Sequence, residues 1–181
     1  MTAPLGFEGT LRSFRQAFDQ TFAAPPINRV ETFEGLLAIR VAGDPYALRV
    51  REIRGVVASR RVVPLPSPKP ELLGVAGIRG SLVAVYSLAA LLGHGADGKA
   101  PSWIALAGAA EPVGLAFEGL DGFVRVRAAD LSAPQPGNGA RPHVGELALV
   151  QGQSRRIVDL PSTLAALEAH AGSAGSAKES R

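Results

Sequence analysis

The chain has 181 residues, which is enough for one domain or for two small barrels that share a chain. Apolar residues make up 46% of it, so a core can form, while 21 glycines and 14 prolines favour many turns and short elements. It contains no cysteine, which excludes disulfides, thiolate chemistry and cysteine-based zinc sites. The formal charge is only +3, although five arginines lie between positions 49 and 61. We expect no nucleic-acid partner, because such a protein concentrates its charge on one face, together with aromatic residues or a known motif.

Nothing in the sequence indicates export or insertion into a membrane. The first ten residues contain no basic region followed by an apolar stretch, as a secretory signal would. The longest apolar stretch, residues 72–92, is interrupted by glycines and by Arg79, and no uninterrupted run reaches the roughly 18 residues that a spanning helix needs. We therefore expect a cytoplasmic protein with no direct membrane insertion.

Residues 1–30 are expected to form an N-terminal extension that contains an amphipathic helix at residues 11–22. The apolar residues there recur at steps of three, four and four, which is one stripe of an α-helix, and Pro25-Pro26 prevents its continuation. The stripe consists of Leu11, Phe14, Phe18 and Phe22. Two interpretations stay open: the stripe packs on its own domain, or it docks on a partner.

From residue 32 onwards the pattern is that of short strands. Strands are expected at residues 36–41, 46–50, 53–58, 75–78, 82–86, 103–107, 113–117, 123–126, 147–151 and 155–158. Turns are expected at Gly43-Asp44-Pro45 and around Arg79-Gly80-Ser81, which would close a buried hairpin. Ten short strands at regular spacing favour an all-β barrel architecture.

The segments between and after these strands are expected to form loops, one helical turn and two short helices. Residues 62–70, with four prolines, are expected to be a loop or an edge, and residues 71–73 one helical turn. Short helices are expected at residues 88–92, ended by Gly93, and at residues 162–170, opened by Pro161. Residues 132–143 are expected to be a linker and residues 171–181 a disordered tail.

Three stretches, in this order, resemble the CheW-like coupling proteins of bacterial chemosensory arrays. Residues 50–55, VREIRG, are similar to the family's V-x-E-I-R-G segment, and residues 73–80, LGVAGIRG, to its G-V-x-N-L-R-G signature. The third stretch is the order of the closing elements, from a Val-Gly-Leu strand to an Ile-Val-Asp-Leu start of the last helix. The resemblance covers roughly residues 33–170, and we take residues 31–170 as the CheW-like domain.

The resemblance implies two intertwined SH3-like five-stranded barrels and a protein without catalytic activity or cofactor. It implies a chemosensory adaptor that couples methyl-accepting chemoreceptors to a CheA-type histidine kinase by binding both, with other CheW-like domains as further partners. The kinase would pack against one surface, and a groove between the barrels would take the chemoreceptor's cytoplasmic tip. Recruitment to chemoreceptor arrays follows from these partners.

Four residues of this chain fall on positions that lie at or near receptor contact in the family, namely Val50, Glu52, Gly74 and Arg79. Gly74, which has no Cβ, would let a partner helix approach the backbone, and Val50 would add apolar contact. Arg79 would donate hydrogen bonds to the partner or brace its own loop, and both roles stay open. Two residues depart from the pattern: Gly77 stands where the family has Asn, and Ser87 where it has Asp.

No combination of residues indicates an enzyme. The three histidines, His94, His143 and His170, have no second ligand at a suitable spacing and are expected to be solvated surface residues. No phosphate loop and no G-x-S-x-G motif occurs. Three alternatives remain: a generic small-barrel module for peptide or nucleic acid, a divergent CheW-like member of a second chemosensory pathway, and, ranked last, a small hydrolase or transferase.

Overall fold

The structure is a computed structural model that describes residues 31–58, 61–95, 100–109, 111–133, 141–150 and 152–175. Residues 32–181 are assigned to one compact unit. The expected helix at residues 11–22 lies outside the described residues, as does most of the expected linker.

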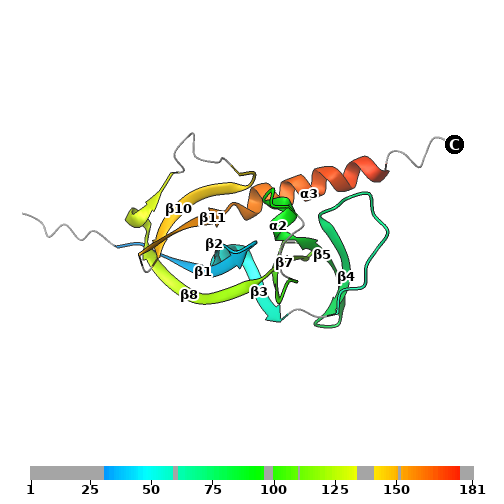
Figure 1. Cartoon of the computed structure of the whole chain (residues 1–181), viewed down its shortest axis with the longest axis horizontal. Coiled ribbons are helices and arrows are strands. Elements are labelled where there is room, and N and C mark those ends of the chain that lie inside the picture. Colours follow the sequence, from blue (N-terminus) through cyan, green and yellow to red (C-terminus); the bar gives the residue numbers. More distant parts are fainter. Residues whose placement is uncertain are drawn as a thin grey trace, which may run out of the picture. The chain divides into compact units, whose positions relative to one another are not determined.

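The first of two curved sheets is built from both ends of the domain (Figure 1). Its strand order is β8-β1-β2-β11-β10-β9, antiparallel throughout except for the parallel pair of β2 with β11. Contacts between β10 and β8 bring the two ends of this sheet together, and we call it the first barrel. Its strands are β1 (Phe33–Val41), β2 (Asp44–Arg49), β8 (Gly119–Arg127), β9 (Leu131–Ser132), β10 (Val144–Val150) and β11 (Gln153–Val158).

The second sheet, the second barrel, is formed by the segment between β2 and β8. Its order is β3-β6-β7-β5-β4, with one parallel pair, β5 with β7. Its strands are β3 (Ile53–Ala58), β4 (Leu72–Ile78), β5 (Ser81–Ser87), β6 (Trp103–Ala107) and β7 (Val113–Phe117). The expected two-barrel, all-β architecture is therefore confirmed, with the two-residue β9 as a sixth strand of the first sheet.

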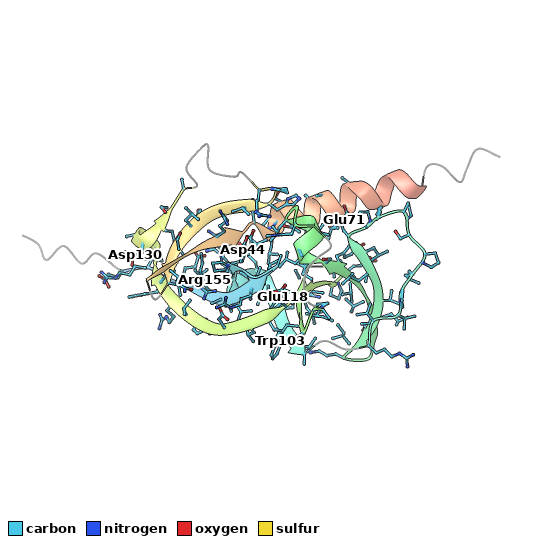
Figure 2. The ribbon with its side chains drawn as sticks, viewed as in Figure 1. Asp44, Glu71, Trp103, Glu118, Asp130 and Arg155 are labelled. Atoms are coloured by element: carbon cyan, nitrogen blue, oxygen red, sulfur yellow. The ribbon has the colours of Figure 1, made fainter. Side chains whose placement is uncertain are left out.

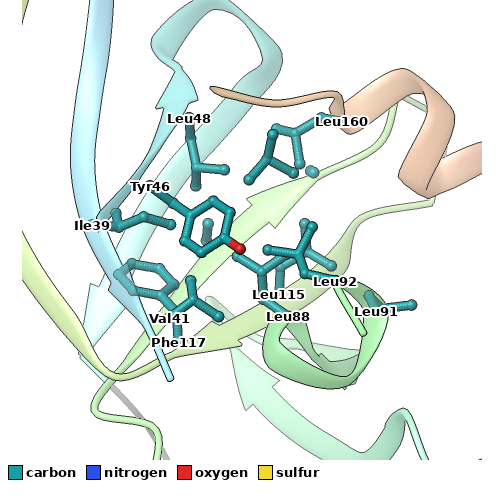
Figure 3. Close-up of a cluster of buried hydrophobic side chains, with 13 residues drawn as sticks. Ile39, Val41, Tyr46, Leu48, Leu88, Leu91, Leu92, Leu115, Phe117 and Leu160 are labelled. Carbon is teal, nitrogen blue, oxygen red and sulfur yellow. The ribbon is translucent and has the colours of Figure 1, made fainter. Parts of the chain in front are cut away.

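The two barrels share a hydrophobic core in addition to a core of their own. Strands β6 and β7 are buried on both faces, which explains why their sequences are continuously apolar rather than alternating. Ile104 and Leu106 face the core of the second barrel, whereas Ala105 and Ala107 face the shared cluster. Figure 3 shows this shared cluster around the ring of Tyr46, which is fully buried. Other members are Ile39, Leu48, Leu88, Leu92, Leu115, Phe117, Val158 and Leu160.

Three short helical elements and one longer helix connect or close the barrels. They are the 3₁₀ turns η1 (Val50–Glu52) and η2 (Ala128–Asp130), and the helices α2 (Leu88–Leu91) and α3 (Leu160–Gly175). Ser87 caps α2 by accepting a hydrogen bond from the backbone N–H of Ala90 at 3.3 Å. Asp159 does the same for α3, since its Oδ1 accepts from the N–H of Ser162 at 3.2 Å. Gly93, with φ of 73°, follows α2 as expected.

Both hairpins of interest close with two residues of positive φ. Arg79 (φ 52°) and Gly80 (φ 83°) connect β4 to β5, and Ala42 (φ 50°) with Gly43 (φ 81°) connects β1 to β2. This is the backbone of a type I′ turn, which matches the twist of the flanking strands. The expected turn at Gly43-Asp44-Pro45 was therefore placed one to two residues too late, since Pro45 already belongs to β2.

Three further expectations are wrong. Residues 71–73 are not a helical turn, because Leu72 pairs with Tyr86 and already belongs to β4. Val50 does not continue the strand before it, because β2 ends at Arg49 and η1 follows. Helix α3 does not end at residue 170 but continues to Gly175, consistent with its content of alanine, a strong helix former.

One charged side chain lies inside the first barrel (Figure 2). Arg155 is 5% exposed and donates hydrogen bonds to the carbonyl of Ile39 at 3.2 Å and to Oδ2 of Asp121 at 2.7 Å. Burial raises the pKa of Asp121, but the hydrogen bonds from Arg155 and Arg40 outweigh this and leave that pKa lowered. The pair therefore ties β11 to β8 and β1 as a charged, hydrogen-bonded unit.

Candidate functional site: a groove between the second barrel and helix α3

The turn η1 is the first covalent crossing from the first barrel to the second. It joins β2 to β3 (Figure 1), so Val50 and Glu52 belong to the segment that links the two barrels. The side chain of Val50 is 37% exposed. Two of the four expected site residues are thus brought together by one short turn.

Arg49 holds this turn in place through ion pairs. Its guanidinium binds carboxylates of three different elements: Glu34 of β1 at 3.1 Å, Glu146 of β10, and Glu52 of η1 at 3.9 Å. Arg51 also reaches Glu34, at 3.0 Å. Because the side chain of Arg49 is only 11% exposed, these are charge-assisted contacts in a partly dehydrated setting, where they hold geometry well. Sequence reasoning gave Arg49 no role of this kind, since its partners are far apart in the chain.

Glu52 is held by one oxygen and leaves the other without a partner. Oε1 faces Arg49, whereas Oε2 is buried and has no hydrogen-bond partner among the described residues. Burial raises the pKa of this carboxyl, and the positive charges of Arg49 and Arg51 counteract the rise only in part. A buried acceptor without a donor is unfavourable by about 1–3 kcal/mol, and Nε of Arg155 inside the first barrel likewise lacks a partner among the described residues.

A groove of about 430 Å³ opens beside Glu52. The β3 residues Ile53 and Arg54 line one side of it, and Leu160 and Leu164 of α3 line another. The β6–β7 turn completes the rim, where Arg54 donates a hydrogen bond to the carbonyl of Ala109. The groove is therefore lined by apolar side chains of β3 and α3 together with the charged side chains of Arg51, Glu52 and Arg54. The contribution of α3 escaped sequence reasoning, which placed this helix only at the end of the domain.

Arg79 lies at the tip of the β4–β5 hairpin and reaches back to β3. A Cβ built on Gly55 would lie 3.2 Å from Nη2 of Arg79, so the guanidinium rests against this backbone, three residues beyond Glu52. This contact favours the bracing role for Arg79 over a role as partner contact alone. Arg79 is exposed and has a φ of 52°.

Gly74 occupies a different place from the other three residues. It is buried, and a Cβ there would lie 2.0 Å from the carbonyl oxygen of Val63. The backbones of Val63 and Val75 form two hydrogen bonds of 2.8 and 2.9 Å at this point. The close approach that glycine permits is thus made by the chain's own loop at residues 61–70, and the reason given from sequence, access for a partner helix, is corrected.

The two departures from the family pattern have different consequences. Ser87 caps α2 with its hydroxyl, a task for which Asp and Ser are equally suited, so the capping contact is preserved. Gly77 is exposed on β4, and a Cβ there would meet nothing within 4 Å. No packing contact among the described residues therefore requires a glycine at position 77.

Two histidines make side-chain contacts, although all three were expected to be solvated surface residues. The side chain of His170 lies outside the described residues. His94 is half-buried, and its Nε2 lies 2.9 Å from the hydroxyl of Tyr46, so its expected role as a solvated residue is wrong. Nδ1 of His143 lies 2.9 Å from Oγ of Ser162. Oδ1 of Asp159 accepts from the backbone N–H of Ser162, which makes it the cap of α3 rather than the third member of a triad.

Among the described residues, no group of three or more histidine, cysteine, aspartate or glutamate side chains is arranged to hold a metal ion. None of the helices in that part of the chain is both long and apolar enough to cross a membrane.

Comparison with known proteins agrees with this architecture. Residues 35–168 match the family model of the CheW-like domain. Among solved structures, the crystal structure of the scaffolding protein TtCheW from Thermoanaerobacter tengcongensis is similar, with a TM-score of 0.63 and 18% sequence identity. The similarity covers 70% of this chain and 89% of that chain, and at this identity it shows the fold alone. Comparison with curated proteins gives no match.

Proposed function

Because this chain belongs to the CheW-like domain family of chemotaxis scaffold proteins, which are not enzymes, we propose that it couples chemoreceptors to a CheA-type histidine kinase. In this proposal the protein binds both partners at once in the cytoplasm, is recruited by them to receptor arrays, and also contacts other CheW-like domains there. Its work is geometric: it holds kinase and receptor in a fixed relation, so that a change in receptor conformation shifts the population of active kinase. Modest contacts suffice, since an array repeats them many times.

The groove beside Glu52 supports receptor binding, and one observation carries this argument. Oε2 of Glu52 is buried without a partner beside an apolar groove of about 430 Å³. A partner helix with an apolar side chain for Ile53 and Leu164 and an N–H donor for Glu52 would satisfy both requirements. The groove is thus suited to a helical tip whose contact face carries one polar donor among apolar residues.

The four residues named from sequence take two kinds of role in this proposal. Val50 and Glu52 contact the receptor directly from η1. Arg79 holds the β4–β5 hairpin against β3, and Gly74 lets the loop at residues 61–70 pack on β4, so both act by keeping the second barrel in shape. We place the domain at residues 31–170.

The test is co-sedimentation of the purified chain with a CheA-type kinase and a receptor cytoplasmic fragment from the same genome. Binding to both partners is expected, and Glu52→Gln should weaken receptor binding about tenfold, the effect of about 1.4 kcal/mol. Asp130→Asn is the matched control, because that carboxylate is 55% exposed on η2. Binding to the kinase alone would contradict the coupling role, and binding to neither would contradict the proposed function as a whole.

A further inference from the structure

A second cavity, of about 390 Å³, is lined by residues of both barrels. Val41 and Ala42 belong to the end of β1 and the turn after it, whereas Leu73 and Ala90 belong to β4 and α2. No described residue lines both this cavity and the groove beside Glu52. The volume lies within the range of about 300–1,000 Å³ that is usual for small-molecule sites.

Small side chains create the volume of this cavity. Five of the described lining residues are alanines, and larger side chains at these positions would fill the space: Ala42, Ala89, Ala90, Ala100 and Ala116. Ala42 has a φ of 50°, a conformation for which the turn between two strands usually has Asn, Asp or Gly. Residues held against a local preference cluster at functional sites, so the alanine at this position is consistent with a binding site.

Two carboxylates line the cavity, and backbone hydrogen bonds fix the position of each (Figure 2). Glu71 precedes β4, and its carbonyl accepts from the N–H of Ser87 at 2.7 Å. Glu118 follows β7, and its N–H donates to the carbonyl of Arg40 at 3.2 Å. Oε2 of Glu118 also accepts from the N–H of Gly43 at 3.0 Å. The fold therefore holds both acidic residues at the wall of the cavity.

No positive charge in the described lining offsets these carboxylates. None of the described lining residues is lysine or arginine, and the nearby Arg141 is paired with Asp44 at 3.7 Å. His94 lines the cavity too, but burial lowers its pKa, so its imidazole is uncharged at neutral pH. The half-buried carboxylate of Glu71 forms no hydrogen bond or ion pair with a described residue. The lining is therefore suited to a ligand of positive charge.

We propose that this cavity is a binding site for a small organic cation, a compact apolar body that carries one protonated amine. The amine pairs with Glu71 in the field of Glu118, and the apolar body packs on Leu73 and the alanines. A metal ion fits less well, because no group of three or more ligating side chains in the described part of the chain is arranged to hold one. Since both barrels line the cavity, the bound cation contacts both. The inference does not depend on the proposed function.

The experiment is a titration of the full chain with benzylamine, followed by the chemical shifts of the backbone amides in NMR spectra. Benzyl alcohol has nearly the same shape without the charge, and benzoate has the opposite charge. Benzylamine should shift the amides of Glu71 and Ala90 and should bind at least about tenfold more tightly than either control compound. A fragment of this size that fits its site binds with a Kd of about 1 mM or lower.

Three variants and one control locate the binding. Glu71→Gln and Glu118→Gln should each weaken benzylamine binding about tenfold, because each removes a charge but keeps an oxygen acceptor. Ala90→Leu should abolish binding by filling the cavity. Glu168→Gln is the matched control, since Glu168 is exposed on α3 and does not line the cavity.

Three results would overturn the inference. Equal affinities for benzylamine and benzyl alcohol would show that the carboxylates select no charge, and no shifts at about 10 mM benzylamine would show that the cavity is not a site. Affinities within about twofold of the wild type in all three variants would place the binding elsewhere. Circular dichroism checks each fold, and Glu71→Gln decides the matter if Ala90→Leu does not fold, because that carboxylate contacts no described residue. No receptor or kinase takes part, so the inference and the proposed function fail separately.

Discussion

The hydroxyl oxygen of Tyr46 lies 2.9 Å from Nε2 of His94, and this contact joins β2 to the segment that follows α2. The ring of Tyr46 is fully buried in the shared cluster, and its hydroxyl group, the only polar group of the side chain, lies beside the imidazole of His94. A neutral histidine can accept the hydrogen bond of the phenol at Nε2, whereas a charged one can only donate to the phenolic oxygen. The pair is therefore sensitive to the protonation of His94.

The first prediction concerns acid stability. Burial, together with the positive charge of Arg141, lowers the pKa of His94 below its ordinary 6.5, so the unfolded chain binds the proton more tightly. The stability that neutral His94 contributes is present above about pH 6.5 and is lost as the pH falls through the lower pKa of the folded state. The free energy of unfolding should therefore fall more steeply between about pH 7.5 and 5.5 in the wild type than in His94→Gln.

Urea denaturation across this pH range measures the effect. Tyr46→Phe is the informative companion variant, because it removes the hydroxyl but leaves His94 covered. Since burial is the largest cause of the lowered pKa, Tyr46→Phe should keep most of the pH dependence. Parallel curves for the wild type and His94→Gln would show that His94 has no such role.

The second prediction is that Glu52→Gln stabilises the fold while it weakens receptor binding. Burial raises the pKa of Glu52, so the charged form is disfavoured in the folded state and lowers stability at neutral pH. The contribution of Glu52 is fully favourable below its unfolded pKa and is lost as the pH rises through the raised pKa. Removing the charge should raise Tm by about 2–4 °C, the shift that about 1 kcal/mol produces in a protein of this size. A Tm equal to or below that of the wild type at pH 7.5 would contradict this.

The third prediction concerns the anchor of η1. Arg49→Met removes one cation from three carboxylates and leaves them close together in a partly buried setting. The loss should be about 2–4 kcal/mol in the free energy of unfolding, since a broken buried ion pair leaves uncompensated charge. Arg127→Met is the control, because its contact with Asp130 is 3.9 Å long and more than half exposed. There the change should stay below about 1 kcal/mol, and equal losses in the two variants would refute a special role for Arg49.

The fourth prediction compares two glycines of β4. Gly74→Ala places a Cβ 2.0 Å from the carbonyl oxygen of Val63, at a φ of 141° that side chains rarely adopt. It should separate the loop at residues 61–70 from β4 and destabilise the protein by about 2 kcal/mol or more. Gly77→Ala should be tolerated, since nothing lies within 4 Å of the added atom. Hydrogen exchange at the amide of Val75 reports the separation, and unchanged protection in Gly74→Ala would contradict it.

The fifth prediction distinguishes the backbone conformation of the turn at Arg79 from the contact that the Arg79 side chain makes with Gly55. Asparagine adopts a positive φ more readily than arginine, and asparagine followed by glycine is the preferred sequence of a type I′ turn. Because Gly80 already follows position 79, Arg79→Asn should keep the hairpin intact. It removes the guanidinium from Gly55, however, and with it the brace between the hairpin and β3. Thermal stability should stay within about 1 kcal/mol of the wild type, the size of an ordinary exposed contact. Receptor binding, measured by calorimetry, should fall, and unchanged affinity would show that the brace does not serve the groove.

Much of the fold could be predicted from local pattern, because most strands are short, apolar and bounded by glycine or proline. The errors lie where local and tertiary preferences differ. Residues 71–73 are too short to distinguish a turn of helix from a strand start, and only the pairing of Leu72 with Tyr86 decides between them. Val50 leaves its strand because the chain must cross to the other barrel at this point, a requirement that β-propensity does not express.

The proposed site contains residues that the sequence pattern named and others that it did not. Val50, Glu52 and Arg79 carry a recognisable sequence pattern, and the structure places the first two in one turn and the third against the strand that follows. The groove itself could not be predicted, since Leu160 and Leu164 reach Glu52 from more than a hundred positions away. The same is true of Arg49, whose partners Glu34 and Glu146 come from the two ends of the domain.

The order in which a ribosome produces these strands differs from the order in which they pair. Strands β1 and β2 are synthesised first, but β11, which lies beside β2, is synthesised last, after the whole second barrel. The nascent chain thus carries an unpaired edge of β2 through most of translation, and such an edge is a template for pairing with other chains. A gene shortened before β11 would leave that edge open permanently, and its product should accumulate as aggregates rather than as a free second barrel.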